Sequence, residues 1–294
     1  MLTREQFIIL TYLQENTSVD YKELFSTLGD SVENIESILL ECIVTGWLTD
    51  EYAITQKGLD ELEPYRVKRA VFLAAGFGSR MVPITINTPK PLVRVNGVRM
   101  IDTLLDAVIA AGIEEIYIVR GYLGEQFDQL LYKYPMIKFI DNSEYDKANN
   151  ISSAFYARHL LQNAYVLEAD LVLYNPSLIT KYQYTSNYLG VPVEETDDWC
   201  FEVTDGVITK LGVGGINCYH EYGISYWNSE DGAKLYDDIK TVYEQPGGKD
   251  YYWDQVPLEQ CILNYKVGVR ECSFDDITEI DSYSELQLID SSYS

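Results

Sequence analysis

The feature that most constrains the fold is an apolar run that ends directly in a glycine turn. Val71 to Ala75 has the composition of a buried strand, and Gly76 and Gly78 follow it with one residue between them. Glycines in this position let backbone N–H groups approach a phosphate, because no side chain stands in the way. Arg80 and Lys90 are the next cations, and they supply the positive charge that a polyphosphate requires. The segment therefore predicts a phosphate-binding loop at the end of a strand.

Two common phosphate-binding fingerprints are excluded. The chain has no G-x-x-x-x-G-K-[ST] motif, and the third glycine of G-x-G-x-x-G would fall at Met81. A Gly-x-Gly turn alone is most often only a turn. The longer string L-A-A-G-x-G-[ST]-R, which includes Ala74, Ala75 and Ser79, is more specific, and Pro-Lys90-Pro-Leu follows it after eight residues. This string resembles the nucleotidyltransferases that make NDP-sugars and CDP-alcohols.

Length and composition narrow the class of protein. The chain has 294 residues, of which 47% are hydrophobic, so we expect a globular protein with two domains. No apolar stretch reaches the roughly 18 residues that span a bilayer, and the N-terminus lacks the features of a signal peptide. Five cysteines lie scattered without C-x-x-C spacing, and there are two histidines. We expect a cytoplasmic protein with reduced thiols, without a zinc site or a histidine-based triad.

The net charge of −24 argues against nucleic acid or an anionic membrane as a partner. A chain this acidic must gather its few cations at the site if it binds a nucleoside triphosphate. We therefore expect it to use a divalent metal as well.

Residues 1–66 are predicted to form a small domain that resembles a winged helix-turn-helix. Three amphipathic helices are expected, the second capped by Ser18 or Asp20 and the third starting at Ser31 and stopping at Gly46, followed by a short hairpin and a last helical turn. Such a domain usually binds DNA, but residues 1–65 contain thirteen acidic and only three basic side chains. We favour a regulatory module or a dimerisation module that would form a homodimer. A DNA-binding regulator with a degenerate sensor domain is the distant alternative.

From residue 67 to 294 the pattern changes to alternating strands and helices. This alternation predicts an α/β layer that binds ligands at the C-terminal ends of its strands. The expected strands are 70–75, 115–120, 137–140 and 164–169, and the helices between them are 100–111, 124–132 and 150–162. After residue 185 we expect shorter strands at 199–204, 207–211 and 223–227, helices at 229–244 and 254–263, and a final strand and helix.

Two aspartates are candidate metal ligands. Asp170 ends the apolar strand 164–169, and Asp281 precedes a capping-box pattern at the start of the last helix. Taken alone, Asp170 is explained as a solvated residue at a strand end and Asp281 as part of a helix cap. Together they offer the hard oxygen ligands that Mg²⁺ prefers. In the polar stretch 139–150, the amides of Asn142 and Asn150 are candidates for reading a ribose or a base edge.

Aromatic residues beside carboxylates are candidates for binding a cationic acceptor. Tyrosine and tryptophan faces attract cations, and quaternary ammonium groups are the usual ligands of such cages. Packing in the core is the alternative explanation in a chain with 25 tyrosines. The candidates are Trp199, Tyr226, Tyr252, Trp253 and Asp254.

With these motifs in place, residues from about Lys68 to Leu288 resemble the bacterial choline-phosphate cytidylyltransferases. The resemblance rests on the glycine loop with Arg80 and Lys90, Val119–Phe127, Asn142 with Tyr145 and Asn149-Asn150, Tyr165–Asp170, Gly223–Trp227, Tyr252-Trp253-Asp254 and Glu279–Ser282. It implies a Rossmann-like, GT-A-like mixed sheet. Nothing of the resemblance extends to residues 1–65.

The resemblance also implies a reaction. CTP would lie along Gly76–Arg80 with its base near Ala74, Gly121 and Tyr122, and Asp170 and Asp281 would hold Mg²⁺. Lys90 would neutralise charge at the α-phosphate while phosphocholine attacks and pyrophosphate leaves. Other acceptors remain open, namely a sugar 1-phosphate, phosphoethanolamine or 2-aminoethylphosphonate, because a primary ammonium needs hydrogen-bond acceptors as well as ring faces.

Overall fold

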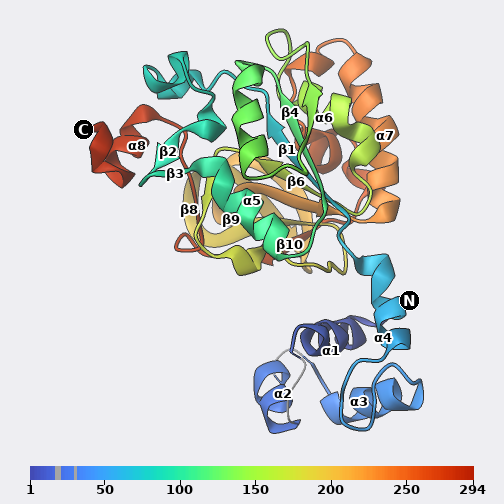
Figure 1. The fold of residues 1–294 in the computed structure, drawn as a ribbon. Helices are drawn as coiled ribbons and strands as arrows, with labels where there is room; N and C mark the ends of the chain where they lie inside the picture. Colours follow the sequence, from blue (N-terminus) through green and yellow to red (C-terminus); the bar gives the residue numbers. More distant parts are fainter. Residues whose placement is uncertain (17–20, 30–31) are drawn as a thin grey trace. The chain divides into compact units, whose positions relative to one another are not determined.

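The computed structural model describes residues 1–16, 21–29 and 32–294. The chain divides into two compact units, coloured from blue to red along the sequence in Figure 1. The first unit comprises Met1–Arg66 together with Tyr182–Tyr184, and the second comprises Val67–Lys181 and Thr185–Ser294. From the sequence we expected the short segment Tyr182–Tyr184 in the second domain, whereas in the structure it belongs to the first unit.

The first unit is built from helices α1 (Arg4–Glu15), α2 (Tyr21–Leu28), α3 (Ile35–Val44) and α4 (Gln56–Leu62). A capping box between Thr3 and Gln6 starts α1, and Gly46, with φ of +75°, follows the end of α3. The expected hairpin is reduced to one bridge between Leu48 and Ile54. The predicted caps at Ser18, Asp20 and Ser31 lie outside the described residues, and the winged-helix assignment stays a prediction.

The second unit is organised around a mixed sheet. Within the described residues, seven strands are ordered β10-β8-β9-β6-β1-β4-β5. Their bounds are β1 Arg69–Ala74, β4 Glu115–Arg120, β5 Lys138–Asp141, β6 Ala164–Glu168, β8 Asn187–Thr204, β9 Val207–Trp227 and β10 Gly268–Glu271. Strand β1 is parallel to β4 and β6, whereas β9 is antiparallel to β6. The predicted α/β class with a mixed sheet is confirmed.

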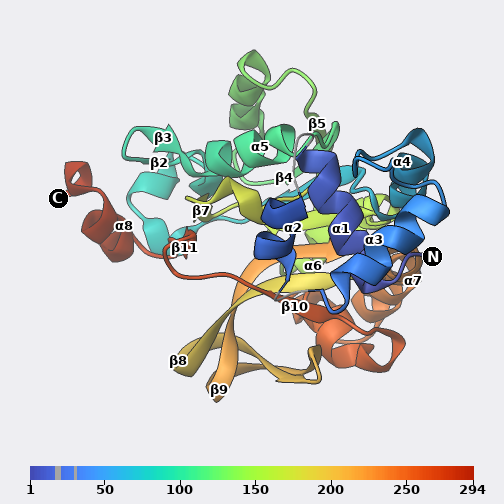
Figure 2. The same ribbon diagram turned by 90° about the horizontal axis from the view of Figure 1, so that it is seen from below.

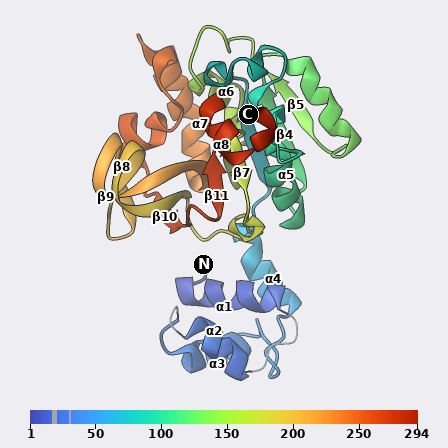
Figure 3. The same ribbon diagram turned by 90° about the vertical axis from the view of Figure 1, so that its left-hand side faces the viewer.

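Two short pairs of strands complete the sheet structure. β2 (Arg94–Val95) pairs with β3 (Val98–Arg99), and β7 (Leu171–Leu173) pairs with β11 (Ile277–Glu279). Figure 3 shows β11 beside β7, with α8 (Tyr283–Ile289) following it. This pairing brings the C-terminal segment back to the end of β6, although the two are more than a hundred residues apart in sequence.

Both faces of the central strand β1 are buried, which explains its continuous apolar run. Phe72 packs into a core with α5 (Met100–Ala110), whereas Val71 and Leu73 face a second core with α6 (Ile151–Ala157) and α7 (Ser229–Glu244). Because β1, β4 and β6 run parallel, their C-terminal ends meet at one edge. The glycine loop and Asp170 follow two of these strands, so the fold places them side by side.

The predicted pattern is wrong mainly after residue 185. Instead of short strands, β8 and β9 form one long hairpin that projects from the unit in Figure 2. A left-handed Asp205-Gly206 turn joins them, and several register shifts interrupt the pairing. Each shift breaks the alternation of apolar and polar residues, so the sequence resembles several short segments.

Three predicted helices also differ in type. Residues 124–132 form a 3₁₀ helix, and α6 is followed by a 3₁₀ turn at Arg158–Leu160. The helix expected at 254–263 is a π-helix, Val256–Gln260, followed by a 3₁₀ turn at Ile262–Asn264. None of the helices in the described part of the chain combines the length and apolarity needed to span a bilayer.

Candidate active site

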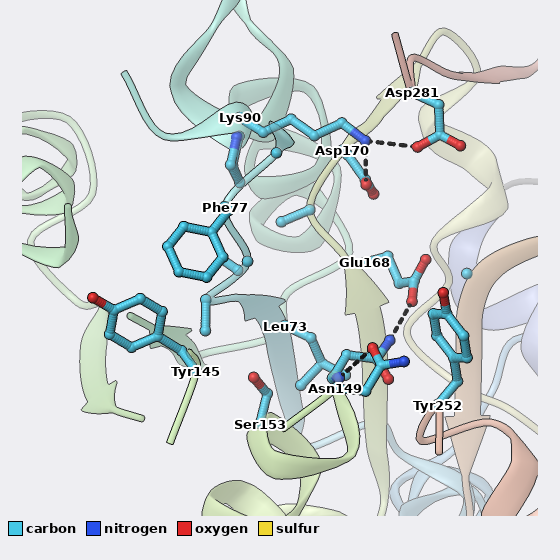
Figure 4. A pocket seen from close by; sticks show the side chains of 18 of the residues that line it. Leu73, Phe77, Lys90, Tyr145, Asn149, Ser153, Glu168, Asp170, Tyr252 and Asp281 are labelled. Atoms are coloured by element: carbon cyan, nitrogen blue, oxygen red, sulfur yellow. Dashed lines mark hydrogen bonds and ion pairs between the residues drawn. The ribbon is translucent and has the colours of Figure 1, made fainter. Parts of the chain in front are cut away.

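A cavity of about 640 Å³ opens where β1 and β6 end. Figure 4 shows three regions: Phe77 and Tyr145 on one side, Glu168 and Tyr252 on the other, and Lys90 with Asp170 and Asp281 between and above them. The predicted site residues that line it are Ala74, Ala75, Gly76, Gly78, Ser79, Arg80, Lys90, Asn142, Asn150, Asp170, Trp199, Tyr252, Asp254 and Asp281. The structure therefore brings most of the predicted residues to one place.

The second glycine of the loop is required by the backbone and by a close neighbour. Gly78 has φ of +59°, and a Cβ added there would lie 2.8 Å from the Cβ of Lys90. The Thr85 hydroxyl donates a hydrogen bond to the carbonyl oxygen of Gly78 over 2.8 Å. The loop is thus packed directly against the lysine that follows it, and this contact sets the position of the Lys90 side chain.

Lys90 connects the two predicted metal ligands. Its Nζ donates to Asp170 Oδ2 over 2.7 Å and to Asp281 Oδ1 over 2.8 Å, and the side chain is buried. Arg80 contacts the other oxygen of Asp281 at 2.7 Å. Burial lowers the pKa of Lys90, but the two carboxylates outweigh it and raise the pKa above its ordinary value. Lys90 is therefore a fixed ammonium group at the cavity wall.

The carboxylates grouped with Asp170 differ from the predicted pair. Oxygens of Glu168, Asp170 and Glu279 all lie within 4.8 Å of one another, whereas both oxygens of Asp281 are engaged by Lys90 and Arg80. Asp170 Oδ1 is buried and has no hydrogen-bond partner among the described residues. A buried, unpaired carboxylate oxygen with two more carboxylates beside it suits a divalent cation that prefers oxygen ligands.

The side chains of Asn142 and Asn150, which we predicted to bind the nucleotide, both form hydrogen bonds within the protein. Both amide hydrogens of Asn142 are donated to Ser152 and Ser153, and its oxygen accepts from the Glu144 N–H. Asn150 donates to Glu168 Oε1 over 3.0 Å, and its oxygen accepts from the Trp253 N–H over 2.8 Å. Asn142 uses both amide hydrogens within the protein, whereas Asn150 donates one of its two to Glu168. Both residues line the cavity, and their role in binding the nucleotide stays a prediction.

Two of the predicted aromatic residues do line the cavity. The Trp199 and Tyr252 rings meet edge to face with their centroids 5.4 Å apart. Asp254 lies next to them along the cavity wall and accepts a hydrogen bond of 2.6 Å from the Tyr188 hydroxyl. Burial raises the pKa of Asp254 to about 7, against the lowering effect of this hydrogen bond.

Four predicted residues do not line the cavity. Trp253 is buried and stacks on Tyr188, and Tyr226 is buried against Tyr165, so both belong to the core. Because neighbouring residues point in different directions, Tyr252 and Asp254 reach the cavity while Trp253 between them does not.

Gly121 and Tyr122, the other two predicted residues that do not line the cavity, pack against its outer side. A Cβ on Gly121 would lie 2.6 Å from Tyr145, and the Tyr122 N–H donates to Ala75 O.

Several lining residues were absent from the predicted site. They include Phe77, Ser153, Glu168, Asp198, Glu221 and Glu279. Glu168 had a readable signal, because it lies two residues before Asp170 where β6 ends. Glu221 had none, since the register shifts in β8 and β9 decide which side chains face the cavity. Burial, followed by the neighbouring carboxylates, raises the pKa of Glu168 and of Glu221 well above the ordinary range.

Comparison with known proteins decides the family. Residues 70–186 match the model of the MobA-like NTP transferase domain. A 2-aminoethylphosphonate cytidylyltransferase of Lancefieldella rimae is 36% identical over 228 residues, which are 76% of this chain and 92% of that protein. The chain belongs to the cytidylyltransferase family of nucleotidyltransferases. The enzyme class predicted from the glycine loop is confirmed.

Other cytidylyltransferases are similar over the same share of the chain. A choline-phosphate cytidylyltransferase of Streptococcus pneumoniae is 32% identical over 229 residues, covering 76% of this chain and 96% of that protein. The solved structure of the CTP:phosphocholine cytidylyltransferase from Streptococcus pneumoniae matches with a TM-score of 0.71 and 31% identity, covering 78% of this chain and all of that one. The predicted resemblance to this branch is confirmed.

Proposed function

We propose that this cytidylyltransferase transfers the cytidylyl group of CTP to phosphocholine, giving CDP-choline and pyrophosphate. The observation that carries the choice of acceptor is the Trp199–Tyr252 ring pair, which lines the cavity beside Asp254. A quaternary ammonium has no N–H to donate, so it is bound through electrostatic attraction. Aromatic ring faces and a nearby carboxylate both provide that attraction.

The charges of the cavity support an acceptor with a cationic end. Two basic side chains line it, Arg80 and Lys90, against seven acidic ones: Glu168, Asp170, Asp198, Glu221, Asp254, Glu279 and Asp281. The two cations are paired with Asp170 and Asp281, at the end of the cavity nearest the glycine loop. Glu168 and Glu279 lie beside Asp170, which leaves Asp198, Glu221 and Asp254 as the acidic groups that favour a positive charge at the Trp199 end. A sugar 1-phosphate has no such charge.

The chain's own residues would act by binding and orienting the reactants. The triphosphate lies along the backbone of Gly76–Arg80, and the Lys90 ammonium stabilises the negative charge that grows at the α-phosphate as the acceptor oxygen attacks. Asp170, with Glu168 and Glu279 beside it, would hold Mg²⁺, which neutralises phosphate charge when bound. A side-chain nucleophile is not required, because the acceptor phosphate is itself the nucleophile.

A second acceptor, 2-aminoethylphosphonate, is favoured by a different observation. Glu221 and Asp254 also line the acceptor end, and carboxylate oxygens are the hydrogen-bond partners that a primary ammonium needs. The similarity to the Lancefieldella rimae protein supports the same alternative. The two acceptors share the reaction and differ only in which wall of the cavity holds the cation.

Steady-state kinetics with CTP and Mg²⁺ separate these possibilities. We expect the highest kcat/KM with phosphocholine, and we expect Trp199→Ala to raise the KM for phosphocholine about tenfold with little change in kcat. A tenfold preference for 2-aminoethylphosphonate would replace the first acceptor with the second. Turnover with glucose 1-phosphate and with neither amine would overturn both.

A further inference from the structure

We propose that Ser153 selects cytosine, by donating a hydrogen bond to N3 of the base, and that Asn142 sets the direction of this hydrogen bond. The inference rests on the use of CTP and is independent of the acceptor. It concerns the region of the cavity that Figure 4 shows around Phe77, Tyr145 and Ser153.

This region has the chemistry of a base-binding slot. Phe77 lies between the two glycines of the loop, and its ring centroid is 5.4 Å from that of Tyr145 and 5.1 Å from that of Tyr122. Leu73 and the Ser153 side chain complete the wall, and the Lys90 cluster lies at the other end of the loop. Aromatic and apolar faces suit a planar base, while the cationic end suits the phosphates. The fold thus provides an apolar region for the base and a cationic region for the phosphates.

The orientation of the Asn142 amide follows from its partners. The backbone N–H of Glu144 lies 2.9 Å from Oδ1, so this atom must be the oxygen, and the NH₂ group must face the two serines. Nδ2 donates to Ser152 Oγ over 2.9 Å and to Ser153 Oγ over 3.1 Å. Each serine oxygen therefore accepts one of the two amide hydrogens.

The two serines differ in where their own protons go. The Ser152 hydroxyl donates to the carbonyl oxygen of Asn149 over 2.8 Å and is thereby satisfied within the protein. The Ser153 hydroxyl has no acceptor among the described residues, although Ser153 is only 3% exposed. Its oxygen is directed into the cavity in Figure 4. A buried hydroxyl that already accepts from an amide is prepared to donate to a ligand atom.

Cytosine provides the complementary group. Its N3 is an acceptor, whereas N3 of uracil carries a hydrogen and is a donor. To accept from uracil, Ser153 would have to turn its own proton away from the ligand, towards a place without an acceptor. Leaving a buried donor unpaired costs enough to produce a preference of about tenfold or more.

The test compares Ser153→Ala with Ser152→Ala, which removes the same hydroxyl one residue away. Calorimetric binding of CTP and of UTP, each with Mg²⁺, needs no acceptor substrate, so its result does not depend on the identity of the acceptor. We expect Ser153→Ala to weaken CTP binding about tenfold and to lower the CTP/UTP ratio, while Ser152→Ala keeps that ratio. An unchanged ratio in Ser153→Ala would overturn the proposal.

A modified nucleotide identifies the ligand atom. 3-Deazacytidine triphosphate has a C–H in place of N3, so it should bind the native enzyme about tenfold more weakly than CTP does. The Ser153→Ala variant should bind the two nucleotides equally well. Independent, additive losses would contradict a contact between N3 and Ser153.

Asn142→Asp tests the positioning role. The carboxylate would accept from Ser153, which would then present its oxygen to the ligand and favour the N3–H of uracil. We expect the ratio of UTP to CTP affinity to rise. Equal losses for both nucleotides would show that Asn142 has only a structural role.

Discussion

At the scale of single residues, the site depends on Lys90, whose ammonium holds Asp170 and Asp281 together. Lys90→Ala should lower kcat by about 10²- to 10³-fold, because it removes a fixed positive charge from the developing transition state. It also leaves Asp170 without its cationic partner and Asp281 with Arg80 alone, so we expect a loss of a few kcal/mol in unfolding free energy. Pyrophosphate release and chemical denaturation measure the two effects.

A matched control is Lys210→Ala, which removes an exposed lysine paired with Glu202 in the long hairpin. Exposed pairs of this kind contribute about 0–1 kcal/mol, so both activity and stability should stay near those of the native enzyme. If Lys90→Ala kept a near-native kcat, its assigned role would be wrong.

Asp254 should make acceptor binding depend on pH. Burial raises its pKa to about 7, so the neutral form predominates below that pH and the ionised form above it. Because a cationic acceptor favours the ionised form, its KM should rise as the pH falls from 8 to 6. Asp254→Asn should flatten this part of the profile, and an unchanged profile in the variant would rule out Asp254 as the titrating group.

The raised pKa of Asp254 also makes the free energy of unfolding depend on pH. Acceptor binding should improve as the pH rises, whereas the stability of the folded protein should fall. The pKa of Asp254 is higher in the folded state than in the unfolded state, so its favourable contribution is complete at low pH and is lost as the pH rises through about 7. In the absence of substrate, Asp254→Asn should therefore be stabilised relative to the native enzyme more at pH 8 than at pH 5. Thermal unfolding at the two pH values measures this difference.

At the scale of elements, the loop after β1 makes the sharpest structural demand. Gly78→Ala forces a side chain into a left-handed conformation and towards the Cβ of Lys90, so it should cost about 1–2 kcal/mol or more. Gly212→Ala is the control, because nothing lies within 4 Å of its added Cβ. Equal unfolding free energies for the two variants would contradict this account of the loop.

The elements also show what the sequence could and could not predict. The strands 69–74 and 115–120 and the helix Ser229–Glu244 were readable, because continuous apolar runs and amphipathic periods are local signals. The hairpin of β8 and β9 was not, because its register shifts depend on pairing between distant residues. For the same reason Asp170 and Lys90 could be named in advance, whereas Glu221 could not, and Trp253 was mistaken for a cavity residue.

At the scale of the whole molecule, charge limits what the first unit can do. Residues 1–65 contain thirteen acidic and three basic residues, so the unit has few cations with which to bind the phosphate backbone of DNA. We expect no saturable binding to duplex DNA in fluorescence anisotropy at low salt, where electrostatic binding is strongest. Binding that weakened steeply with added salt would instead support a DNA-binding regulator.

The proposed dimerisation role of the first unit predicts a definite mass. One chain has a mass of 33.6 kDa, and light scattering of the full protein should give about twice that value. A monomeric mass at micromolar concentration would exclude this role and leave regulation as the proposal for the unit.

The identity of the product tests the central claim most directly. Phosphorus NMR of the enzyme with CTP, Mg²⁺ and phosphocholine should show the phosphocholine signal replaced by the diphosphate signals of CDP-choline, with one pyrophosphate released for each. The account would be contradicted if phosphocholine stayed unchanged while the enzyme consumed CTP with a sugar 1-phosphate.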